Sequence, residues 1–210
     1  MRGRFITLEG IEGAGKSTQL ATVRALIERA GHEVVVTREP GGTPLAERIR
    51  QVVLAPSEEH VPVLTELFLM FAARCAHLDG LVRPALTRGA WVVCDRFTDA
   101  TLAYQGGGRC VPLATIRTLA QQVHGELWPD LTLLLDVAPA VGLARAGRRG
   151  TADRFERERL EFFERVRAVY LQLAREAPGR IAVIDAGRPA GEVARAVEAP
   201  VHQLLTEHAK

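Results

Sequence analysis

A glycine-rich stretch near the start of the chain has the residue types and the spacing of a phosphate-binding loop. Glycines at positions 10, 13 and 15 lead into Lys16 and Ser17, which matches the pattern G-x-x-x-x-G-K-[ST]. Glycines allow the backbone to curl so that successive N–H groups point at phosphate oxygens. The lysine can reach the β- and γ-phosphates, and the serine hydroxyl can ligate Mg²⁺. This stretch therefore predicts a nucleoside triphosphate site.

Two observations make this motif specific: it is rare by chance, and the elements predicted on either side of it are the expected ones. By average residue usage, the four fixed positions match by chance on the order of once per hundred chains of this length. The alternative is a glycine-rich turn with a surface lysine, but an apolar strand precedes the loop and helical spacing follows it. The predicted triphosphate-binding residues of the loop and helix start are Gly10, Ile11, Glu12, Gly13, Ala14, Gly15, Lys16, Ser17 and Thr18.

The elements that must position this loop follow from the hydrophobic pattern. Five apolar runs have the composition of strands, at 5–8, 33–37, 90–94, 131–135 and 181–184. Helical patterns separate the runs, which predicts βαβ units and a buried parallel sheet. The stretch 61–87 has helical periodicity, with a kink or break expected at Pro84. The expected fold is α/β, a doubly wound five-stranded parallel sheet flanked by helices, with residues 1–210 in a single domain.

Charged residues follow every predicted strand. In a doubly wound sheet, ligands bind beyond the carboxyl ends of the strands. All five predicted ends carry charge, so this edge of the sheet is the expected active site. The residues concerned are Glu9, Arg38, Glu39, Asp95, Arg96, Asp136, Asp185 and Arg188.

Composition excludes several classes of protein. The net charge of +2 is too small to suggest bulk nucleic-acid binding, and no apolar run reaches the roughly 18–20 residues that span a bilayer. Cys75, Cys94 and Cys110 are odd in number and lack C-x-x-C spacing, so neither a disulfide framework nor a structural zinc site is expected. No signal-peptide pattern is present. We expect a cytoplasmic enzyme without nucleic-acid or membrane partners.

Several motifs together carry a family resemblance. They are the loop FITLEGIEGAGKST, then TREPGGT at 37–43, FAAR at 71–74, DRF at 95–97, AYQGGGR at 103–109, PDLTLLLD at 129–136 and RFE at 154–156. In this order and over nearly the whole chain, they resemble those of bacterial thymidylate kinases. The resemblance implies a P-loop kinase domain with a short lid at about 145–156. It also implies phosphoryl transfer from MgATP to dTMP, which yields dTDP for dTTP synthesis, in a homodimer.

An acceptor that carries a phosphate needs cations with several fixed N–H donors, because a nucleoside monophosphate bears about two negative charges. By resemblance, Arg38 and Arg74 hold the acceptor phosphate, Arg96 approaches the transferred group, and Pro40 lies in the same site. The alternative for each arginine is a solvent-exposed side chain. Phe71 stacks on thymine by resemblance, although its helical spacing alone favours a place in the core.

Three polar residues one helical turn apart, Thr101, Tyr104 and Gln105, can read the edge of the base and crowd the sugar. A hydroxyl or amide facing thymine O4 and N3 would select against cytosine, whose donors and acceptors are exchanged. Ala100 and Phe97 depart from the family pattern, which has serine at the first position and often tyrosine at the second.

Two carboxylates near the phosphates have competing interpretations. By resemblance, Glu12 receives the 3′-hydroxyl of dTMP; the alternative is a solvated loop side chain. Asp95 ends an apolar run and is the expected partner of Ser17 at Mg²⁺, held through water, or it orients the phosphate loop. Its alternative is the N-cap of a helix.

The arginine-rich stretch at 145–154 resembles the lid over ATP. In this family the phosphate loop either carries a basic residue or leaves that task to the lid, and here the loop position is Gly13. The expected catalytic cation is Arg149 first and Arg154 second, while Arg145 stacks on adenine and Arg188 joins the ATP site. The alternative is a solvated basic loop.

Rival functions lack required residues. A regulatory GTPase needs an Asn-Lys-x-Asp motif, and the chain has no asparagine. A scaffold with a relict site is disfavoured by the intact Lys16–Ser17 pair. A deoxynucleoside kinase must deprotonate a 5′-hydroxyl, whereas Arg38 and Arg74 favour an acceptor that already bears phosphate. In that case the attacking phosphate oxygen is already ionised, and no general base is required.

Overall fold

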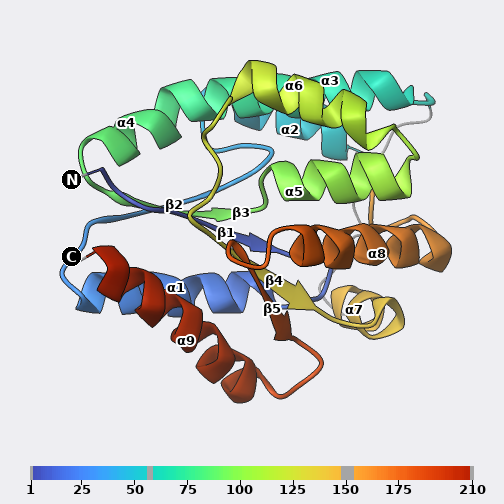
Figure 1. The fold of residues 1–210 in the computed structure, drawn as a ribbon. Coiled ribbons are helices and arrows are strands. Elements are labelled where there is room, and N and C mark those ends of the chain that lie inside the picture. The colour runs from blue at the N-terminus through green and yellow to red at the C-terminus, as the bar shows by residue number, and fades with distance from the viewer. Residues whose placement is uncertain (1, 56–58, 148–153, 209–210) are drawn as a thin grey trace.

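The computed structural model describes residues 2–55, 59–147 and 154–208, and a five-stranded parallel sheet lies between two layers of helices (Figure 1). The strands are β1 (Phe5–Glu9), β2 (Val34–Arg38), β3 (Trp91–Asp95), β4 (Leu131–Asp136) and β5 (Ile181–Asp185). Their order in the sheet is β2-β3-β1-β4-β5, and every pairing is parallel. The predicted fold class is therefore confirmed, and each strand lies within one residue of its predicted bounds.

The burial of the strands follows their place in the sheet. The central strand β1 is buried along its whole length, whereas the edge strands β2 and β5 are partly exposed. This explains why β1 is so apolar and why its one hydroxyl, on Thr7, is bonded to Thr132 of β4 at 2.8 Å. The register pairs Leu8 with Asp95 and Asp95 with Arg38, so the carboxyl ends of β1, β3 and β2 lie side by side.

Helices cover both faces of the sheet (Figure 1). On one face, α1 (Lys16–Arg29) packs against α9 (Ala190–His208). The other helices are α2 (Pro44–Leu54), α3 (Val63–His77), α4 (Arg83–Thr87), α5 (Thr98–Thr101), α6 (Leu113–Val123), α7 (Pro139–Ala146) and α8 (Leu160–Glu176). Among them α3 packs against α2 and α6, and α8 packs against α7. None of the described helices is long and apolar enough to cross a membrane.

Two π-helical segments connect some of these helices. The first, η1 (Leu78–Val82), joins α3 to α4 and ends two residues before Pro84, where a kink or break is predicted. Proline has no N–H and its ring crowds the preceding turn, so the wider π-turn accommodates it without ending the helical path. The second, η2 (Leu102–Gly108), carries Tyr104 and Gln105 and packs along α8.

The phosphate loop touches α7 through two glycines. Gly13 has a φ of 72°, and a Cβ built on it would lie 1.9 Å from the carbonyl oxygen of Gly142. A Cβ on Gly142 would in turn lie 2.5 Å from the carbonyl oxygen of Glu12. Because both contacts are with backbone carbonyl groups, neither segment can shift to make room for a side chain without a cost in free energy. The glycine at position 13 is thus required by the fold, and a side chain is sterically excluded there.

We predict that Gly13→Ala destabilises the fold by at least about 2 kcal/mol, because it adds both a clash and a strained positive φ. Urea denaturation followed by circular dichroism measures the effect. The matched control is Gly191→Ala in α9, where an added Cβ meets no atom within 4 Å; it should be neutral or stabilising by up to about 1 kcal/mol. Equal stability of the two variants would contradict the prediction.

Candidate functional site

The phosphate loop connects β1 to α1 at the carboxyl edge of the sheet. Gly10, Gly13 and Gly15 have φ values of 135°, 72° and 91°, which are the left-handed conformations that glycine supplies. Gly15 directly precedes α1, and no side chain caps this helix end. The N–H groups of its first turn and the positive end of the helix dipole are therefore available to bind an anion. Ser17 and Thr18 lie exposed on this turn.

Lys16 is buried beneath the loop. Its Nζ donates to the carbonyl oxygens of Gly10 and Ile11, each at 3.1 Å. Burial, and secondarily the charge of Arg96, lower the pKa of Lys16 to about 8, while neighbouring carboxylates oppose the shift. In the free protein, nearby carboxylates only partly compensate the positive charge of Lys16. A triphosphate would supply further negative charge at this position.

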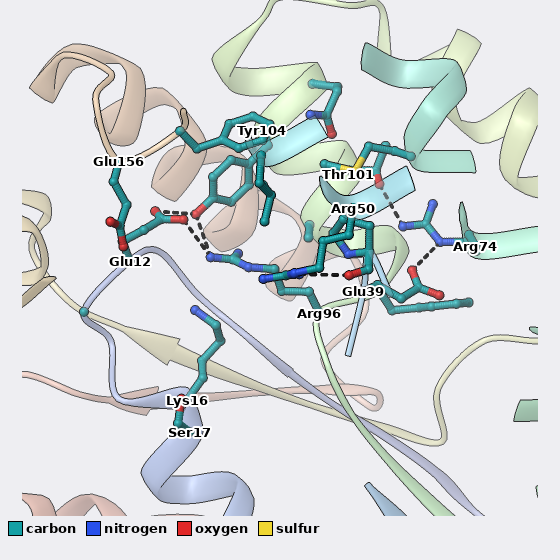
Figure 2. Close-up of a pocket in the computed structure, with 18 of the residues that line it drawn as sticks. Glu12, Lys16, Ser17, Glu39, Arg50, Arg74, Arg96, Thr101, Tyr104 and Glu156 are labelled. Atoms are coloured by element: carbon teal, nitrogen blue, oxygen red, sulfur yellow. Dashed lines mark hydrogen bonds and ion pairs between the residues drawn. The ribbon is translucent and has the colours of Figure 1, made fainter. Parts of the chain in front are cut away.

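A cavity opens above the loop and extends to α3 and η2 (Figure 2). Lys16 and Ser17 lie at one end of the view, and Arg74 and Thr101 lie at the other. The cavity is lined by Glu12, Gly13, Gly15, Lys16, Ser17, Glu39, Pro40, Arg50, Leu54, Met70, Arg74, Arg96, Phe97, Ala100, Thr101, Tyr104, Gln105, Phe155 and Glu156. Residues from five separate parts of the chain are thus brought to one site.

Arg96 lies at the centre of the cavity, with a φ of 72° directly after β3. Its Nη2 donates to Glu12 at 2.9 Å and to the Tyr104 hydroxyl at 3.0 Å, and its Nη1 donates to the Gly10 carbonyl at 2.9 Å. The Tyr104 hydroxyl donates to the second oxygen of Glu12 at 2.6 Å. The structure therefore brings three predicted site residues, Glu12, Arg96 and Tyr104, into one hydrogen-bonded group.

A buried carboxyl group lies behind Arg96. Glu9 accepts from the Tyr170 hydroxyl at 2.7 Å and from the Phe97 N–H at 2.7 Å, while Tyr170 also contacts Nη1 of Arg96 at 3.3 Å. Burial, and then the nearby Asp99, raise the pKa of Glu9 to about 8. Tyr170 belongs to the apolar stripe of α8, so no sequence signal distinguished it from a core residue.

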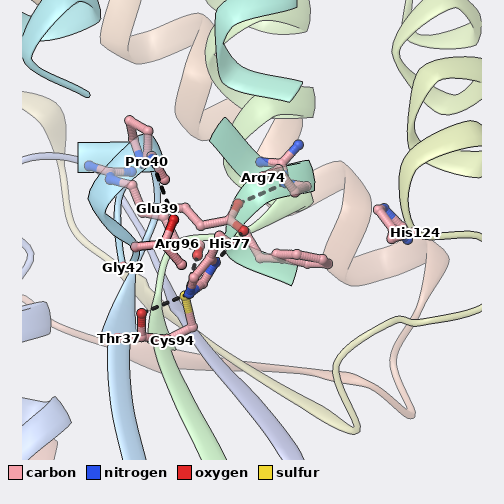
Figure 3. A network of polar contacts seen from close by, with 12 residues as sticks. Thr37, Glu39, Pro40, Gly42, Arg74, His77, Cys94, Arg96 and His124 are labelled. Atoms are coloured by element: carbon pink, nitrogen blue, oxygen red, sulfur yellow. Dashed lines mark hydrogen bonds and ion pairs between the residues drawn. The ribbon is translucent and has the colours of Figure 1, made fainter. Parts of the chain in front are cut away.

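Arg74 belongs to a buried polar network (Figure 3). Its Nε donates to Glu39 at 2.7 Å and its Nη2 donates to Thr101 at 2.9 Å. Glu39 also contacts Nδ1 of His77 at 2.9 Å, and Nε2 of His77 contacts Thr37 at 2.7 Å. Burial pushes the pKa of Glu39 up, but Arg74 and His77 outweigh it and hold the pKa below its usual range. Arg74 is thus fixed in place, and its charge is matched.

Two buried atoms of the cavity residues have no hydrogen-bond partner in the described structure. They are Nη1 of Arg74 and Oε1 of Gln105. Gln105 directs its other amide atom, Nε2, to Glu66 at 2.8 Å. A buried polar group without a partner is costly, so these two atoms mark places where a ligand can bond. One is a donor and the other is an acceptor.

The predicted acceptor residues Arg38 and Phe71 do not line the cavity. Arg38 is exposed and donates to Glu47 at 3.0 Å. Phe71 is 4% exposed and packs in the core, with the Arg74 guanidinium 4.9 Å from its ring centre. Arg50 of α2 lines the cavity instead and donates to the Pro40 carbonyl at 2.8 Å. Nothing in the sequence separates Arg50 from the many other arginines.

The predicted metal residues fit a magnesium ion shared with a nucleotide. Oδ1 of Asp95 is buried without a partner, and the exposed Ser17 lies in the first turn of α1. The residue at the N-cap position of α5 is Phe97, so Asp95 does not cap that helix. Within the described ranges no three His, Cys, Asp or Glu residues cluster to hold a metal. The ion would therefore take its remaining ligands from phosphates and water.

Three of the predicted lid and adenine residues lie in the described part of the structure. Arg145 donates to the carbonyl oxygens of Ala186 and Gly187 at 2.7 and 3.3 Å, and the exposed Arg188 donates to Asp185 at 3.0 Å. Arg154 is held away from the cavity lining by Glu66, with the charged atoms 2.7 Å apart. Arg149 lies outside the described residues. The roles assigned to these arginines stay predictions.

Comparison with known proteins agrees with this geometry. A family model described as thymidylate kinase matches residues 8–197. The thymidylate kinase of Pseudomonas entomophila (strain L48) is 59% identical over 205 residues, which are 98% of each chain. The thymidylate kinase of Pseudomonas putida (strain W619) is 57% identical over 201 residues, covering 96% of this chain and 97% of that one. This chain belongs to the thymidylate kinase family.

A solved structure supports the same assignment. The crystal structure of the thymidylate kinase from Ehrlichia chaffeensis has a TM-score of 0.78 and 32% sequence identity, covering 96% of this chain and 99% of that one. Membership in the thymidylate kinase family confirms that the chain is a nucleotide-binding kinase with the P-loop fold that its motifs predict. The site residues are assigned from the geometry described above.

We predict that nucleotide binding takes up protons at Lys16. The pKa of Lys16 is about 8 in the free enzyme, and phosphate charge raises it in the complex. Bound enzyme then holds more protons above pH 8, so affinity for an ATP analogue falls as the pH rises. Calorimetric titration at pH 8 in two buffers of different ionisation enthalpy measures the uptake. Lys16→Arg is the control, because its charge does not titrate. Equal uptake by both proteins would refute the assignment.

Proposed function

We propose that this kinase transfers the γ-phosphoryl group of MgATP to dTMP and forms dTDP and ADP, a step toward dTTP. One observation carries the proposal. A single cavity is lined by phosphate-binding groups and also by Arg74, which has an unpartnered donor, and by Gln105, which has an unpartnered acceptor. The membership of the chain in the thymidylate kinase family agrees with this choice of acceptor.

The two unpartnered atoms complement thymine. Thymine presents the O4 acceptor next to its N3–H donor, so O4 can accept from Nη1 of Arg74 while N3–H donates to Oε1 of Gln105. Cytosine presents a donor and an acceptor in the reverse order, which would leave both protein atoms unpaired. Such a mismatch is a strong basis for rejection. We therefore assign Arg74 to the base rather than to the acceptor phosphate.

The cations nearest the phosphate loop are assigned to the phosphates. Arg96 lies between Lys16 and the base end of the cavity, and Arg50 lies beside it (Figure 2). Both line the cavity, so both can contact the acceptor phosphate with several N–H donors. Arg38 stays a predicted phosphate ligand that would first have to leave Glu47. Glu12 and Tyr104 are assigned to the sugar, and Phe71 supports Arg74 from below.

The chemistry is in-line transfer with little covalent work for the protein. The attacking oxygen belongs to the dTMP phosphate and is already ionised, so no general base is needed. Lys16, the loop N–H groups and the first turn of α1 hold the ATP phosphates, while Arg96 screens the repulsion between the two anions. Bound Mg²⁺, held by Ser17 and through water by Asp95, would neutralise charge on the β- and γ-phosphates. Arg149 and Arg154 are the proposed cations of the lid.

We predict that dTMP is the best acceptor in a coupled ADP-release assay that also offers dUMP, dCMP, dGMP, AMP and thymidine. The kcat/KM for dCMP should be at least roughly 100-fold lower, because its base edge leaves two buried groups unpaired. Thymidine lacks the phosphate that Arg50 and Arg96 are assigned to bind, and it should be inactive. A higher rate with thymidine than with dTMP would identify a deoxynucleoside kinase instead.

We also propose that residues 1–210 form one P-loop kinase domain and that the enzyme works in the cytoplasm. The sheet uses strands from residue 5 to residue 185, so no part of that span forms a sheet of its own in the described structure. Cys75, Cys94 and Cys110 are free thiols, and Cys75 and Cys110 are exposed, which suits a reducing compartment.

A homodimer is proposed to form through the outer face of α2 and α3. Large apolar side chains are exposed there on two packed helices, namely Leu45, Val52, Leu64 and Phe68. Leu64 and Phe68 are one turn apart on α3, and both are more than half exposed, at 53% and 55%. A second copy of the same face would remove this apolar surface from water.

We predict that Phe68→Glu converts the dimer to monomer, because it buries a charge in an apolar interface. Sedimentation velocity measures the change in mass, and circular dichroism checks the fold. Leu160→Glu is the matched control, since Leu160 is also exposed but lies at the start of α8. A wild-type protein that sediments as a monomer, or a Phe68→Glu variant that stays dimeric, would exclude this interface.

A further inference from the structure

Glu66 is a buried carboxylate of α3 that contacts three side chains. Its side chain is 1% exposed. Oε2 pairs with Arg154 at 2.7 Å, and Oε1 accepts from Gln105 at 2.8 Å and from Arg109 at 3.4 Å. Glu66 does not itself line the cavity. It touches the cavity through Gln105 alone among these three partners.

The contact between Glu66 and Gln105 decides which amide atom remains for a ligand. A carboxylate is an acceptor only, so it can bond the NH₂ group of the amide and not the oxygen. The Gln105 side chain is 0% exposed, and its Oε1 is left buried without a partner. A glutamine without such a neighbour could turn by half a rotation and offer a donor instead. Glu66 therefore fixes the orientation of the Gln105 amide.

We propose that Glu66 is a positioning residue for base selection: it holds the Gln105 amide so that the acceptor pocket always presents an acceptor to the base. This inference rests on the proposed function, because it assigns the N3–H of thymine to Oε1 of Gln105. Arg109 and Arg154 fix Glu66 in turn. Arg109 also pairs with Glu158 at 2.6 Å, and Arg154 also donates to the Val53 carbonyl at 2.9 Å.

The arginine partners hold the Glu66 carboxylate in its place. A lone buried carboxylate is expensive, whereas one that pairs with two guanidinium groups is compensated. An amide at position 66 has both a donor and an acceptor, so it would accept either orientation of Gln105. The site would then lose its fixed preference for a base with a hydrogen on N3, without losing any residue that touches the substrate.

The test is Glu66→Gln, assayed with dTMP and with dCMP. We predict that the ratio of kcat/KM for dTMP over dCMP falls by roughly tenfold or more, the size expected for one base-edge hydrogen bond. Glu158→Gln is the matched control, because it removes a carboxylate from Arg109 but has no contact with Gln105; its ratio should stay within about twofold of wild type. A change in kcat alone, with the ratio preserved, would be a merely structural effect and would overturn the proposal.

A double-mutant cycle separates positioning from general destabilisation. If Glu66 acts through Gln105, the variant Glu66→Gln/Gln105→Leu loses no more discrimination than Gln105→Leu alone. Additive losses would overturn the proposal. If Glu66→Gln does not fold, as thermal unfolding would show, Glu66→Asp takes its place: it keeps the charge for the arginines but retracts from Gln105, and it should lower the same ratio. An unchanged ratio in that variant would also overturn the proposal.

The wild-type enzyme tests the proposed function independently of Glu66, through its preference for dTMP over dCMP. A wild type that does not prefer dTMP over dCMP would refute the proposed function, and this inference about thymine would fall with it. A wild type that does prefer dTMP, combined with an unchanged ratio in Glu66→Gln, would refute only the role of Glu66.

Discussion

The pairing of buried and partly buried guanidinium groups with carboxylates is the interaction on which the site depends. Arg74 pairs with Glu39 at 2.7 Å, Arg96 with Glu12 at 2.9 Å and Arg154 with Glu66 at 2.7 Å. A kinase that joins two anions must gather positive charge, yet an unpaired buried charge costs several kcal/mol. These carboxylates stabilise the arginines in the free enzyme and also hold each one in a defined geometry, so the cavity exists before a ligand arrives.

The same pairs leave selected atoms free. Glu39 and Thr101 occupy two nitrogens of Arg74, and the third remains for a ligand; Glu66 occupies the amide nitrogen of Gln105, and its oxygen remains. In the proposed function, these partners thus decide which atoms of Arg74 and Gln105 are left to bond the base. Hydrogen-bond donors and acceptors that are fixed before binding cost little further ordering when the ligand arrives, which is how a small pocket discriminates strongly between similar bases.

The phosphate loop follows a different principle. Its specificity comes from backbone geometry: glycines with positive φ, a helix end without a cap, and a lysine whose pKa burial lowers to about 8. The close approach of Gly13 to Gly142 shows why the loop has no side chain at that position, so a basic residue for the transferred group must come from another segment. The arginines of the predicted lid are the candidates for that role.

The local sequence determined the phosphate loop, the five strands and the doubly wound sheet, because glycine conformations and apolar periodicity depend on neighbours in the chain. The resemblance of the motifs likewise identified the family. Pro84 illustrates a limit: a kink or break was predicted there, but the π-helical segment 78–82 that precedes it was not.

The tertiary structure alone decided how the charges are partnered. Arg38 and Arg50 are equally arginines in the sequence, but Arg38 turns to Glu47, whereas Arg50 reaches the cavity. Tyr170 and Glu66 read as ordinary members of helices, yet packing brings them to Glu9 and Gln105. Hydrogen bonds between residues far apart in the chain depend on how helices pack across the sheet, and no pattern of neighbouring residues encodes that distance.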